Sequence, residues 1–294
     1  MRAILLCGGS GSRLYPTTKV VNKQLLPIYD KPMVYYPLSI LLLAGIREIL
    51  IISTEEDISS YKNLFEDGSQ LGIHFEYVVQ PRPEGIAQAF LLAEDFLEGD
   101  DACLILGDNI FHGQNMAELL MSSVEAVKTT GKAQVFGYHV EDPERFGVAD
   151  FDPQGNVIKL EEKPTNPTSN YAVVGLYFYP GNVVEVAKKV KPSARGELEI
   201  TSVNQAYLKT NQLKLNVLDK QVTWLDTGTH ETLLEASNFI KATEQTENKK
   251  IACIEEIAYE KGYIDQQQLT DLVNNMGNNN YSKYLASKAR GASH

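Results

Sequence analysis

This chain of 294 residues has little cysteine, no excess of basic charge and no long apolar run, and each shortage excludes a class of protein. Its three cysteines, Cys7, Cys103 and Cys253, are scattered and odd in number. They form no disulfide or metal motif and suit buried thiols in a reducing compartment. The formal net charge of −11 argues against nucleic-acid binding, which needs a basic patch. Any anionic ligand must therefore meet a local cluster of positive charge.

The apolar stretches are too short for a membrane protein. The longest, Pro37 to Ile46, is interrupted by Ser39 and cannot span a bilayer. The N-terminus enters a strand-like segment directly, without the basic stretch and apolar core of a signal peptide. A hydrophobic fraction of 43% and a charged fraction of 22% are typical of globular proteins. We therefore expect a cytoplasmic protein of one large domain or about two ordinary ones, with no membrane partner.

Strand-like and helix-like segments alternate through the first half of the chain. This βαβα order predicts an α/β fold with a mixed, mostly parallel central sheet covered by helices on both faces. The predicted strands are Ile4–Cys7, Glu48–Ser53, His74–Val79 and Ala102–Leu106, and the predicted helices are Pro32–Ala44, Ile58–Phe65 and Ile86–Leu97.

The pattern changes after residue 146. Alternating residues in Gly147–Asp152 and Val157–Glu162, joined by a Pro-Gln-Gly-Asn turn, predict a β-hairpin. The sheet is then predicted to continue through strand Asn170–Tyr179, helices near Val183–Val190 and Ile200–Lys209, and strand Leu213–Leu218. From about His230 the pattern is almost wholly helical, with a loop at Gly277–Asn280 and a loose tail over Arg290–His294. We therefore divide the chain into an α/β core, residues 1–229, and a helical region, residues 230–294.

A glycine-rich loop directly follows the first predicted strand. In Gly8-Gly9-Ser10-Gly11-Ser12-Arg13 the glycines permit a sharp turn, and successive free N–H groups can bind an anion. Arg13 and Lys23 add positive charges where a triphosphate would lie. The loop lacks the lysine of a Walker motif, and Leu14 stands where a dinucleotide-binding loop has its third glycine. An ordinary tight turn with a surface arginine is the alternative.

Two aspartates end apolar segments that lie far apart in the sequence. Asp108 follows Leu104–Gly107, and Asp226 follows Trp224-Leu225. Open α/β sheets bind ligands at the carboxyl ends of strands, and Mg²⁺ on a nucleotide is usually held by one or two carboxylates. Lys163 stands at the corner that closes the predicted hairpin. The alternatives are an Asx-turn for Asp108, a helix cap for Asp226 and a solvated surface lysine.

Together these segments resemble the sugar nucleotidyltransferases, and more narrowly the bacterial glucose-1-phosphate thymidylyltransferases. The resemblance runs nearly the whole length of the chain. It rests on the glycine loop, Lys23–Met33, Gln80-Pro81 with Gly85–Ala89, Gly107–Phe111, Glu162-Lys163-Pro164, Ser193–Thr201 and Trp224–Thr229. It implies a Rossmann-like nucleotidyltransferase fold.

The resemblance implies transfer of a thymidylyl group from dTTP to glucose 1-phosphate, which gives dTDP-glucose and pyrophosphate. This is the first step towards dTDP-deoxysugars such as dTDP-L-rhamnose. Arg13 and the glycine loop would hold the β and γ phosphates, and Lys23 would bridge phosphates near the reacting centre. The implied nucleotide-binding residues are Gly8, Gly9, Gly11, Ser12, Arg13, Lys23, Gln24, Gln80, Gly85 and Asp108.

The same resemblance gives the metal and sugar sites. Asp108 and Asp226 would bind Mg²⁺, and Lys163 would bind the phosphate of the sugar. The catalytic set is thus Arg13, Lys23, Lys163, Asp108 and Asp226, and no side chain needs to act as nucleophile or general base. The implied sugar-binding residues are Asn109, Gly147, Glu162, Lys163, Val173 and Asp226.

The chain departs from the family pattern at two places. Ser12 replaces the more usual threonine, which keeps a hydroxyl. Cys253-Ile254-Glu255-Glu256-Ile257 lacks the proline that follows this cysteine in the long members. That region resembles the regulatory and contact region of homotetrameric members, in which a deoxysugar nucleotide such as dTDP-rhamnose is a feedback inhibitor. A sibling enzyme that uses UTP and a catalytically silent binding subunit are the alternatives; Gln24 and Gln80 favour dTTP.

Overall fold

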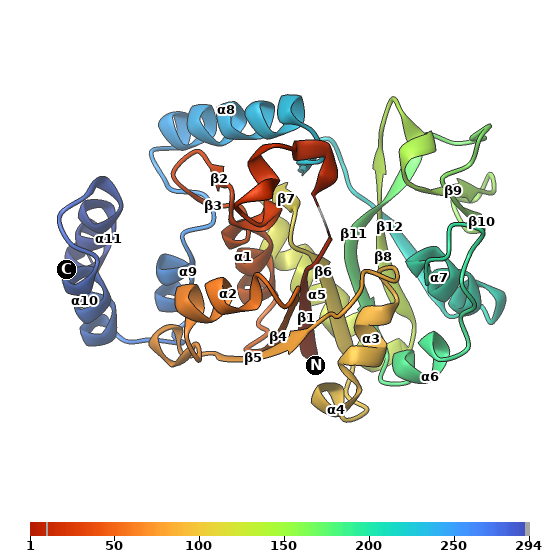
Figure 1. Ribbon diagram of the computed structural model, residues 1–294, viewed down its shortest axis with the longest axis horizontal. Helices are drawn as coiled ribbons and strands as arrows, with labels where there is room; N and C mark the ends of the chain where they lie inside the picture. The colour runs from red at the N-terminus through yellow and green to blue at the C-terminus, as the bar shows by residue number, and fades with distance from the viewer. Residues whose placement is uncertain (10, 292–294) are drawn as a thin grey trace.

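The computed structural model describes residues 1–9 and 11–291 and has a mixed central sheet with helices on both faces (Figure 1). The strands follow the order β10-β9-β11-β6-β1-β4-β5, and β8 and β12 continue the sheet from β11. Strands β5, β4, β1 and β6 are parallel neighbours, whereas β11 is antiparallel to β6. The predicted α/β class is therefore confirmed. The strand bounds are β1 Arg2–Cys7, β4 Glu48–Ser53, β5 His74–Val79, β6 Ala102–Leu106, β8 Ala133–His139, β9 Gly147–Phe151, β10 Val157–Glu162, β11 Tyr171–Tyr179 and β12 Leu213–Val217.

Strand β1 is apolar from Ala3 to Cys7 because both of its faces are buried there. Leu5 and Cys7 pack in one hydrophobic cluster, and Ile4 and Leu6 pack in another. The first cluster includes residues of α1 Tyr35–Leu43, α2 Ile58–Phe65 and α5 Met116–Thr130. The second includes residues of α3 Gln88–Leu92, α4 Glu94–Leu97, α6 Val183–Ala187 and α7 Ile200–Lys209. Cys7, Cys103 and Cys253 are all free thiols and all buried, as expected.

Two predicted helices need correction. The helix predicted over Pro32–Ala44 is α1 and begins only at Tyr35, because Lys31–Pro32 form β3, which pairs with β2, Pro27–Ile28. The helix predicted over Ile86–Leu97 is divided into α3 and α4, because Ala93, with ψ of 7°, departs from helical geometry. Strand β7, Asn109–His112, which pairs with β13, Thr223–Asp226, was not predicted from the sequence.

The predicted hairpin is present as β9 and β10. Asp152 closes its turn, since its Oδ1 accepts hydrogen bonds from the N–H groups of Gln154 at 2.9 Å and Asn156 at 2.8 Å. Gly155 has φ of 81°, and Asn156 Nδ2 donates to Asp152 Oδ2 at 3.0 Å, so the predicted turn is built on Asp152, Gly155 and Asn156. Next to this hairpin, β9 also pairs with β11.

Four helices follow residue 229 among the described residues: α8 His230–Glu247, α9 Ile254–Glu260, α10 Gln266–Asn275 and α11 Asn280–Gly291. The predicted helical region is present, but the predicted loose tail is wrong for Arg290 and Gly291, which belong to α11. Residues 292–294 lie outside the described part. Cys253 and Leu269 join the same cluster as Leu5 of the sheet, and the boundary at residue 229 stays a prediction. Within the described residues, no helix is long and apolar enough to cross a membrane.

Candidate active site

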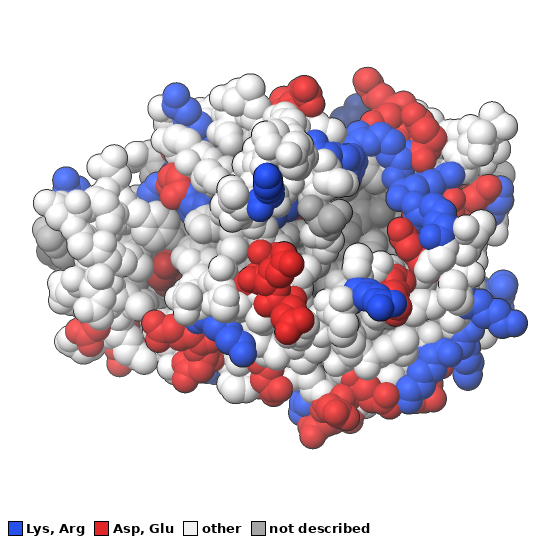
Figure 2. Space-filling view, in the orientation of Figure 1, with Lys and Arg blue, Asp and Glu red and all other residues white. Residues whose placement is uncertain are grey.

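Three hollows meet where β1 and β6 end at the same edge of the sheet. We call them the wide hollow, of about 750 Å³, the inner hollow, of about 270 Å³, and the loop hollow, of about 250 Å³. Figure 2 shows this face hollowed near its centre, with Lys and Arg side chains along the rim. Asp108 lines all three hollows, so a ligand in any of them comes close to the same carboxylate.

Every predicted site residue lines at least one of these hollows. The loop hollow is lined by Gly8, Gly9, Gly11, Ser12, Arg13, Lys23, Gln24 and Asp108. The inner hollow adds Gln80, Gly85, Glu162 and Lys163, and the wide hollow adds Asn109, Gly147, Val173 and Asp226. Residues drawn from positions 8 to 226 of the sequence are thus brought to one place, while their individual roles stay predictions.

The glycine loop needs its glycines for space as well as for backbone conformation. Gly9 has φ of 95° and Gly11 has φ of 57°, backbone angles that residues other than glycine rarely adopt. A Cβ on Gly8 would lie 2.3 Å from Gln80 Oε1. Arg13 lines both the loop hollow and the wide hollow, so it is not merely an arginine on the outer surface.

Lys23 stands beside Asp108 at the bottom of the loop hollow. It lies in a short 3₁₀ turn, Lys23–Leu25, and its Nζ donates to Asp108 Oδ2 at 2.5 Å. Burial alone would raise the pKa of Asp108. The Lys23 ammonium and its hydrogen bond, together with hydrogen bonds from Asn109 and the backbone, outweigh that effect and hold the pKa of Asp108 below its ordinary value. Asp108 therefore remains an anion in the site.

Asp226 reaches the same place through the pairing of β13 with β7, which sets it opposite Asn109. Its Oδ2 lies 3.1 Å from Arg145 Nη2. Burial, and then the neighbouring Asp108 carboxylate, raise the pKa of Asp226, although Lys23, Arg13 and Arg145 oppose this. The carboxylates of Asp108 and Asp226 thus lie in one site, and the positive charge around Asp226 is too small to offset its burial and the neighbouring Asp108.

Three hydrogen bonds fix the side-chain amide of Asn109, which in turn orients the carboxylate of Asp108. Its Oδ1 accepts hydrogen bonds from Trp224 Nε1 at 2.7 Å and from the Gly175 N–H at 3.1 Å, and its Nδ2 donates to Asp108 Oδ1 at 3.0 Å. The side chain is 3% exposed. Neither Trp224 nor Gly175 was predicted to be a site residue from the sequence.

The hairpin forms the far wall of the wide hollow. Glu162 Oε2 accepts a hydrogen bond from Thr201 Oγ1 at 2.5 Å, and a Cβ on Gly147 would lie 2.8 Å from the same hydroxyl. Lys163 has φ of 44°, an unusual value for lysine, and its N–H donates to Phe146 O at 2.9 Å. This turn brings Lys163 to the border of the wide and inner hollows.

Amide side chains line the inner hollow. Gln80 Nε2 donates to Gln88 Oε1 at 2.7 Å, and Gln24 Nε2 donates to Gly8 O at 3.3 Å. Gln24 Oε1 is buried and has no hydrogen-bond partner among the described residues. An unpaired buried acceptor is costly, so this oxygen suits a donor supplied by a ligand.

Two arginines of the site were missed. Arg145 pairs with Asp226, and Arg195 lines the inner hollow, where its Nη2 lies 2.8 Å from Glu199 Oε1 and 3.1 Å from Glu197 Oε2. The Ser193–Thr201 segment was part of the family resemblance, so Arg195 could have been found there. Arg145 carried no comparable signal.

The part of the chain that the structure describes does not by itself offer enough ligands for a metal ion, so a substrate and water would have to supply the others. Among the described residues, no group of three or more His, Cys, Asp or Glu side chains could hold an ion. Asp108 and Asp226 provide two carboxylates, and phosphate oxygens and water would complete the octahedron that Mg²⁺ prefers.

Comparison with known proteins defines the class. Residues 2–243 match the family model described as nucleotidyl transferase. The chain therefore belongs to the nucleotidyltransferase family, whose members are enzymes.

Full-length relatives narrow this assignment. The chain is 51% identical to a glucose-1-phosphate thymidylyltransferase of Neisseria meningitidis over 97% of this chain and 98% of that protein. It is 52% identical to the enzyme of the same name from Xanthomonas campestris pv. campestris, over 100% of this chain and 99% of that protein. It is thus a member of the glucose-1-phosphate thymidylyltransferase group.

Solved structures agree. A Bacillus anthracis protein described as a glucose-1-phosphate thymidylyltransferase, in complex with a sucrose, has a TM-score of 0.74 and 43% identity. The match covers 81% of this chain and 94% of that one. A UDP-glucose pyrophosphorylase complexed with UDP-glucose has a TM-score of 0.69 at 23% identity, over 82% of this chain and 98% of that one, and shows the fold alone.

Proposed function

We propose that this enzyme transfers a thymidylyl group from dTTP to α-D-glucose 1-phosphate, forming dTDP-glucose and pyrophosphate. The observation that carries this proposal is that Asp108 lines the loop, inner and wide hollows at once. A triphosphate, a base and a sugar phosphate can then meet beside one carboxylate. The names of the full-length relatives support the same pair of substrates.

The nucleotide would lie along the loop and inner hollows. Free N–H groups of the glycine loop and the Arg13 guanidinium would hold the β and γ phosphates. Lys23 would contact the phosphates next to Asp108. Gln24 Oε1, which is buried without a partner among the described residues, would accept a hydrogen bond from the N3–H of thymine, with Gln80 alongside.

The sugar phosphate would lie in the wide hollow with its phosphate beside Lys163. One of its phosphate oxygens attacks the α-phosphorus of dTTP in line, and the bond from that phosphorus to the pyrophosphate oxygen breaks. The attacking phosphate is already ionised, so no side chain has to remove a proton. Lys163 positions the nucleophile, and Arg13 stabilises the charge on the leaving pyrophosphate.

Asp108 and Asp226 are the residues that would hold Mg²⁺. The raised pKa of Asp226, caused by burial and by the charge of Asp108, supports this, because a bound cation would relieve both effects. When bound, the ion would supply positive charge to the phosphate oxygens. Arg145 would keep Asp226 oriented through their contact at 3.1 Å.

One assay tests the proposal. Pyrophosphate release is measured with dTTP, UTP, CTP and ATP, each with glucose 1-phosphate as acceptor. The highest kcat/KM is expected with dTTP. Turnover with UTP that equals or exceeds turnover with dTTP would overturn the nucleotide assignment, and no release with any nucleotide would favour a silent binding subunit.

A fourth hollow, of about 410 Å³, bears on regulation. It lies beside α1, α5 and the α8–α9 connection and is lined in part by Lys249, Lys250 and Cys253. Three glutamates, Glu247, Glu256 and Glu260, line it as well, and Lys250 is already paired with Asp30 and Glu244, so Lys249 at the exposed rim is the lysine that could meet a phosphate. The resemblance of the Cys253–Ile257 segment suggests that a deoxysugar nucleotide such as dTDP-rhamnose would bind here as feedback inhibitor, in a homotetramer of the dTDP-L-rhamnose pathway. Inhibition by dTDP-rhamnose that is unchanged in Lys249→Met would contradict this site.

The cytoplasmic location of the protein stays a prediction.

A further inference from the structure

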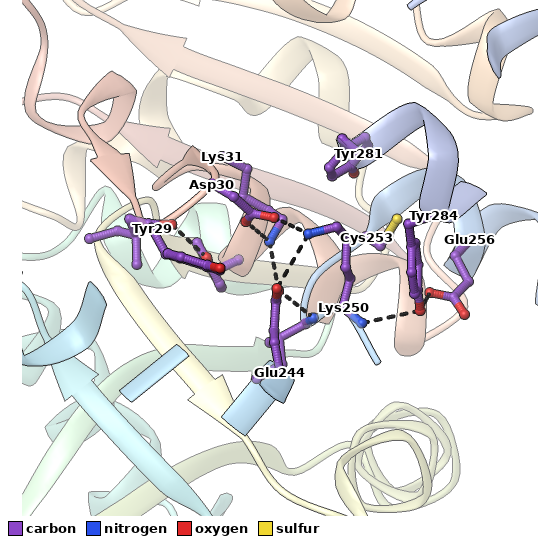
Figure 3. A network of polar contacts seen from close by, with 12 residues as sticks. Tyr29, Asp30, Lys31, Glu244, Lys250, Cys253, Glu256, Tyr281 and Tyr284 are labelled. Carbon is purple, nitrogen blue, oxygen red and sulfur yellow. Dashed lines mark hydrogen bonds and ion pairs between the residues drawn. The ribbon is translucent and has the colours of Figure 1, made fainter. Parts of the chain in front are cut away.

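Four charged side chains, those of Asp30, Lys31, Glu244 and Lys250, close a ring (Figure 3). Lys31 Nζ pairs with Asp30 Oδ1 and, at 3.1 Å, with Glu244 Oε1. Lys250 Nζ pairs with Asp30 Oδ2 and, at 3.3 Å, with Glu244 Oε2. The charges alternate around the ring, so each carboxylate contacts both ammonium groups. None of these four residues lines the loop, inner or wide hollow.

Two members of the ring, Lys31 and Glu244, are buried, whereas Lys250 is partly exposed and Asp30 lies at the surface. Lys31 is 4% exposed, and its Nζ lies 5.3 Å from the centre of the Tyr36 ring. Glu244 Oε1 also accepts a hydrogen bond from the Ile251 N–H at 2.9 Å. A buried charge that loses its partner is costly, so each member holds the others in place.

Backbone hydrogen bonds connect this ring to the active site. Ile28 pairs with Lys31 between β2 and β3, and the Met33 N–H donates to Leu26 O at 2.9 Å. The Val34 N–H donates to Gln24 O at 2.9 Å. Residues 23–34 thus form one hydrogen-bonded hairpin, with the ring at its tip and Lys23 and Gln24 at its base.

The other end of this hairpin has its own anchor. Asn22 Oδ1 accepts hydrogen bonds from the Gln24 N–H at 3.0 Å and from Tyr61 OH at 2.7 Å. Asn22 Nδ2 donates to Asp57 Oδ2 at 2.7 Å. Lys23 and Gln24 are therefore bracketed by a polar anchor at Asn22 and by the ion ring at Lys31.

We propose that Lys31 is a positioning residue for nucleotide binding: through the closed ring with Asp30, Glu244 and Lys250, it fixes the hairpin that presents Lys23 and Gln24 to the nucleotide. This inference rests on the proposed function, because it assigns Lys23 and Gln24 to the nucleotide. It ties the site to α8, which lies outside the glycine loop and the hairpin.

The test separates positioning from stability. Lys31→Met leaves one uncompensated negative charge in the ring. The double variant Lys31→Met/Glu244→Gln leaves the ring neutral but still without the direct contact of Lys31 with α8, so that only Lys250 joins Asp30 to residue 244. Lys188→Met is the control, because Lys188 forms exposed ion pairs with Glu94 and Glu185. Tm, the KM for each substrate and the Kd of the nucleotide by calorimetry are measured with whichever of the four nucleotides the wild type uses best.

In Lys31→Met we expect a lower Tm and a KM for the nucleotide raised about tenfold, with the KM for glucose 1-phosphate within about twofold. In the double variant the Tm should recover while the nucleotide KM and Kd stay raised. Recovery of KM and Kd together with Tm would overturn the proposal, as would equal effects on both substrates. If Lys31→Met does not fold, the double variant decides alone. Preference of the wild type for UTP would contradict the proposed function and leave this comparison valid.

Discussion

Lys23 Nζ lies 2.5 Å from Asp108 Oδ2, and this contact joins the base of the hairpin of residues 23–34 to the end of β6. The ammonium lowers the pKa of Asp108 against the opposing effect of burial. Stability from this pair is thus present above the ordinary value of 3.8 and is lost as the pH falls through the lowered value.

Lys23→Met should therefore change both pH dependence and rate. Without the ammonium, burial would raise the pKa of Asp108, and the acid limb of the rate profile should move to higher pH. The kcat/KM for dTTP is expected to fall roughly a hundredfold. Rate profiles against pH measure both effects. Lys19→Met, a change at an exposed lysine nearby, should leave them unaltered.

Asp226→Asn should make the protein more stable and less active. The pKa of Asp226 is raised, so its ionisation opposes folding as the pH rises from 3.8 through the raised value. The variant should gain a few degrees in Tm at neutral pH and lose roughly a hundredfold in pyrophosphate release. Mg²⁺ should raise the Tm of the wild type more than that of the variant. Full activity in Asp226→Asn would remove this carboxylate from the mechanism, and Asp219→Asn in an exposed turn serves as the control.

Gly147→Ala should affect one substrate only. The added methyl would lie 2.8 Å from Thr201 Oγ1 and 3.3 Å from Glu162 Oε2, in the wall of the wide hollow. We expect the KM for glucose 1-phosphate to rise about tenfold while the KM for dTTP stays constant. Steady-state kinetics with each substrate varied in turn measure both KM values. An equal rise in the KM for dTTP would contradict the prediction and indicate that the sugar lies elsewhere.

Gln24→Met should weaken nucleotide binding. Loss of the amide removes the buried acceptor, and the KM for dTTP is expected to rise about tenfold with little change for glucose 1-phosphate. Gln70→Met is a matched control. Gln70 Oε1 is also buried without a partner among the described residues, its Nε2 donates to Phe65 O at 2.8 Å, and it lines none of the three hollows. An equal change in both variants would show a general effect of losing a buried amide.

The sheet was predictable where local composition records burial. Strands such as β4 and β6 lie at their predicted bounds because a strand covered on both faces carries a continuous apolar run, Ile49–Ile52 in β4 and Ala102–Leu106 in β6. Gly8 and Asp108 were predictable as site residues because a glycine turn and a strand-end acid follow such strands directly.

Long-range pairing was not predictable in the same way. Nothing in the segments themselves indicates that Asp226 lies opposite Asn109, because the pairing of β13 with β7 is decided by packing of the whole fold. Charged residues such as Arg145 and Lys31 look like solvated surface residues in the sequence. Only the assembled structure brings them to buried carboxylates.

Glu162 and Lys163 form a wall shared by the inner and wide hollows, whereas Gly147 and Val173 line only the wide one. With the sugar in the wide hollow and the base in the inner hollow, as proposed, changes at Gly147 or Val173 would admit a different sugar without altering the choice of base. Changes at Glu162 or Lys163 would alter both choices together. Diversification of the sugar would then begin on β9 and β11 and leave the corner after β10 unchanged.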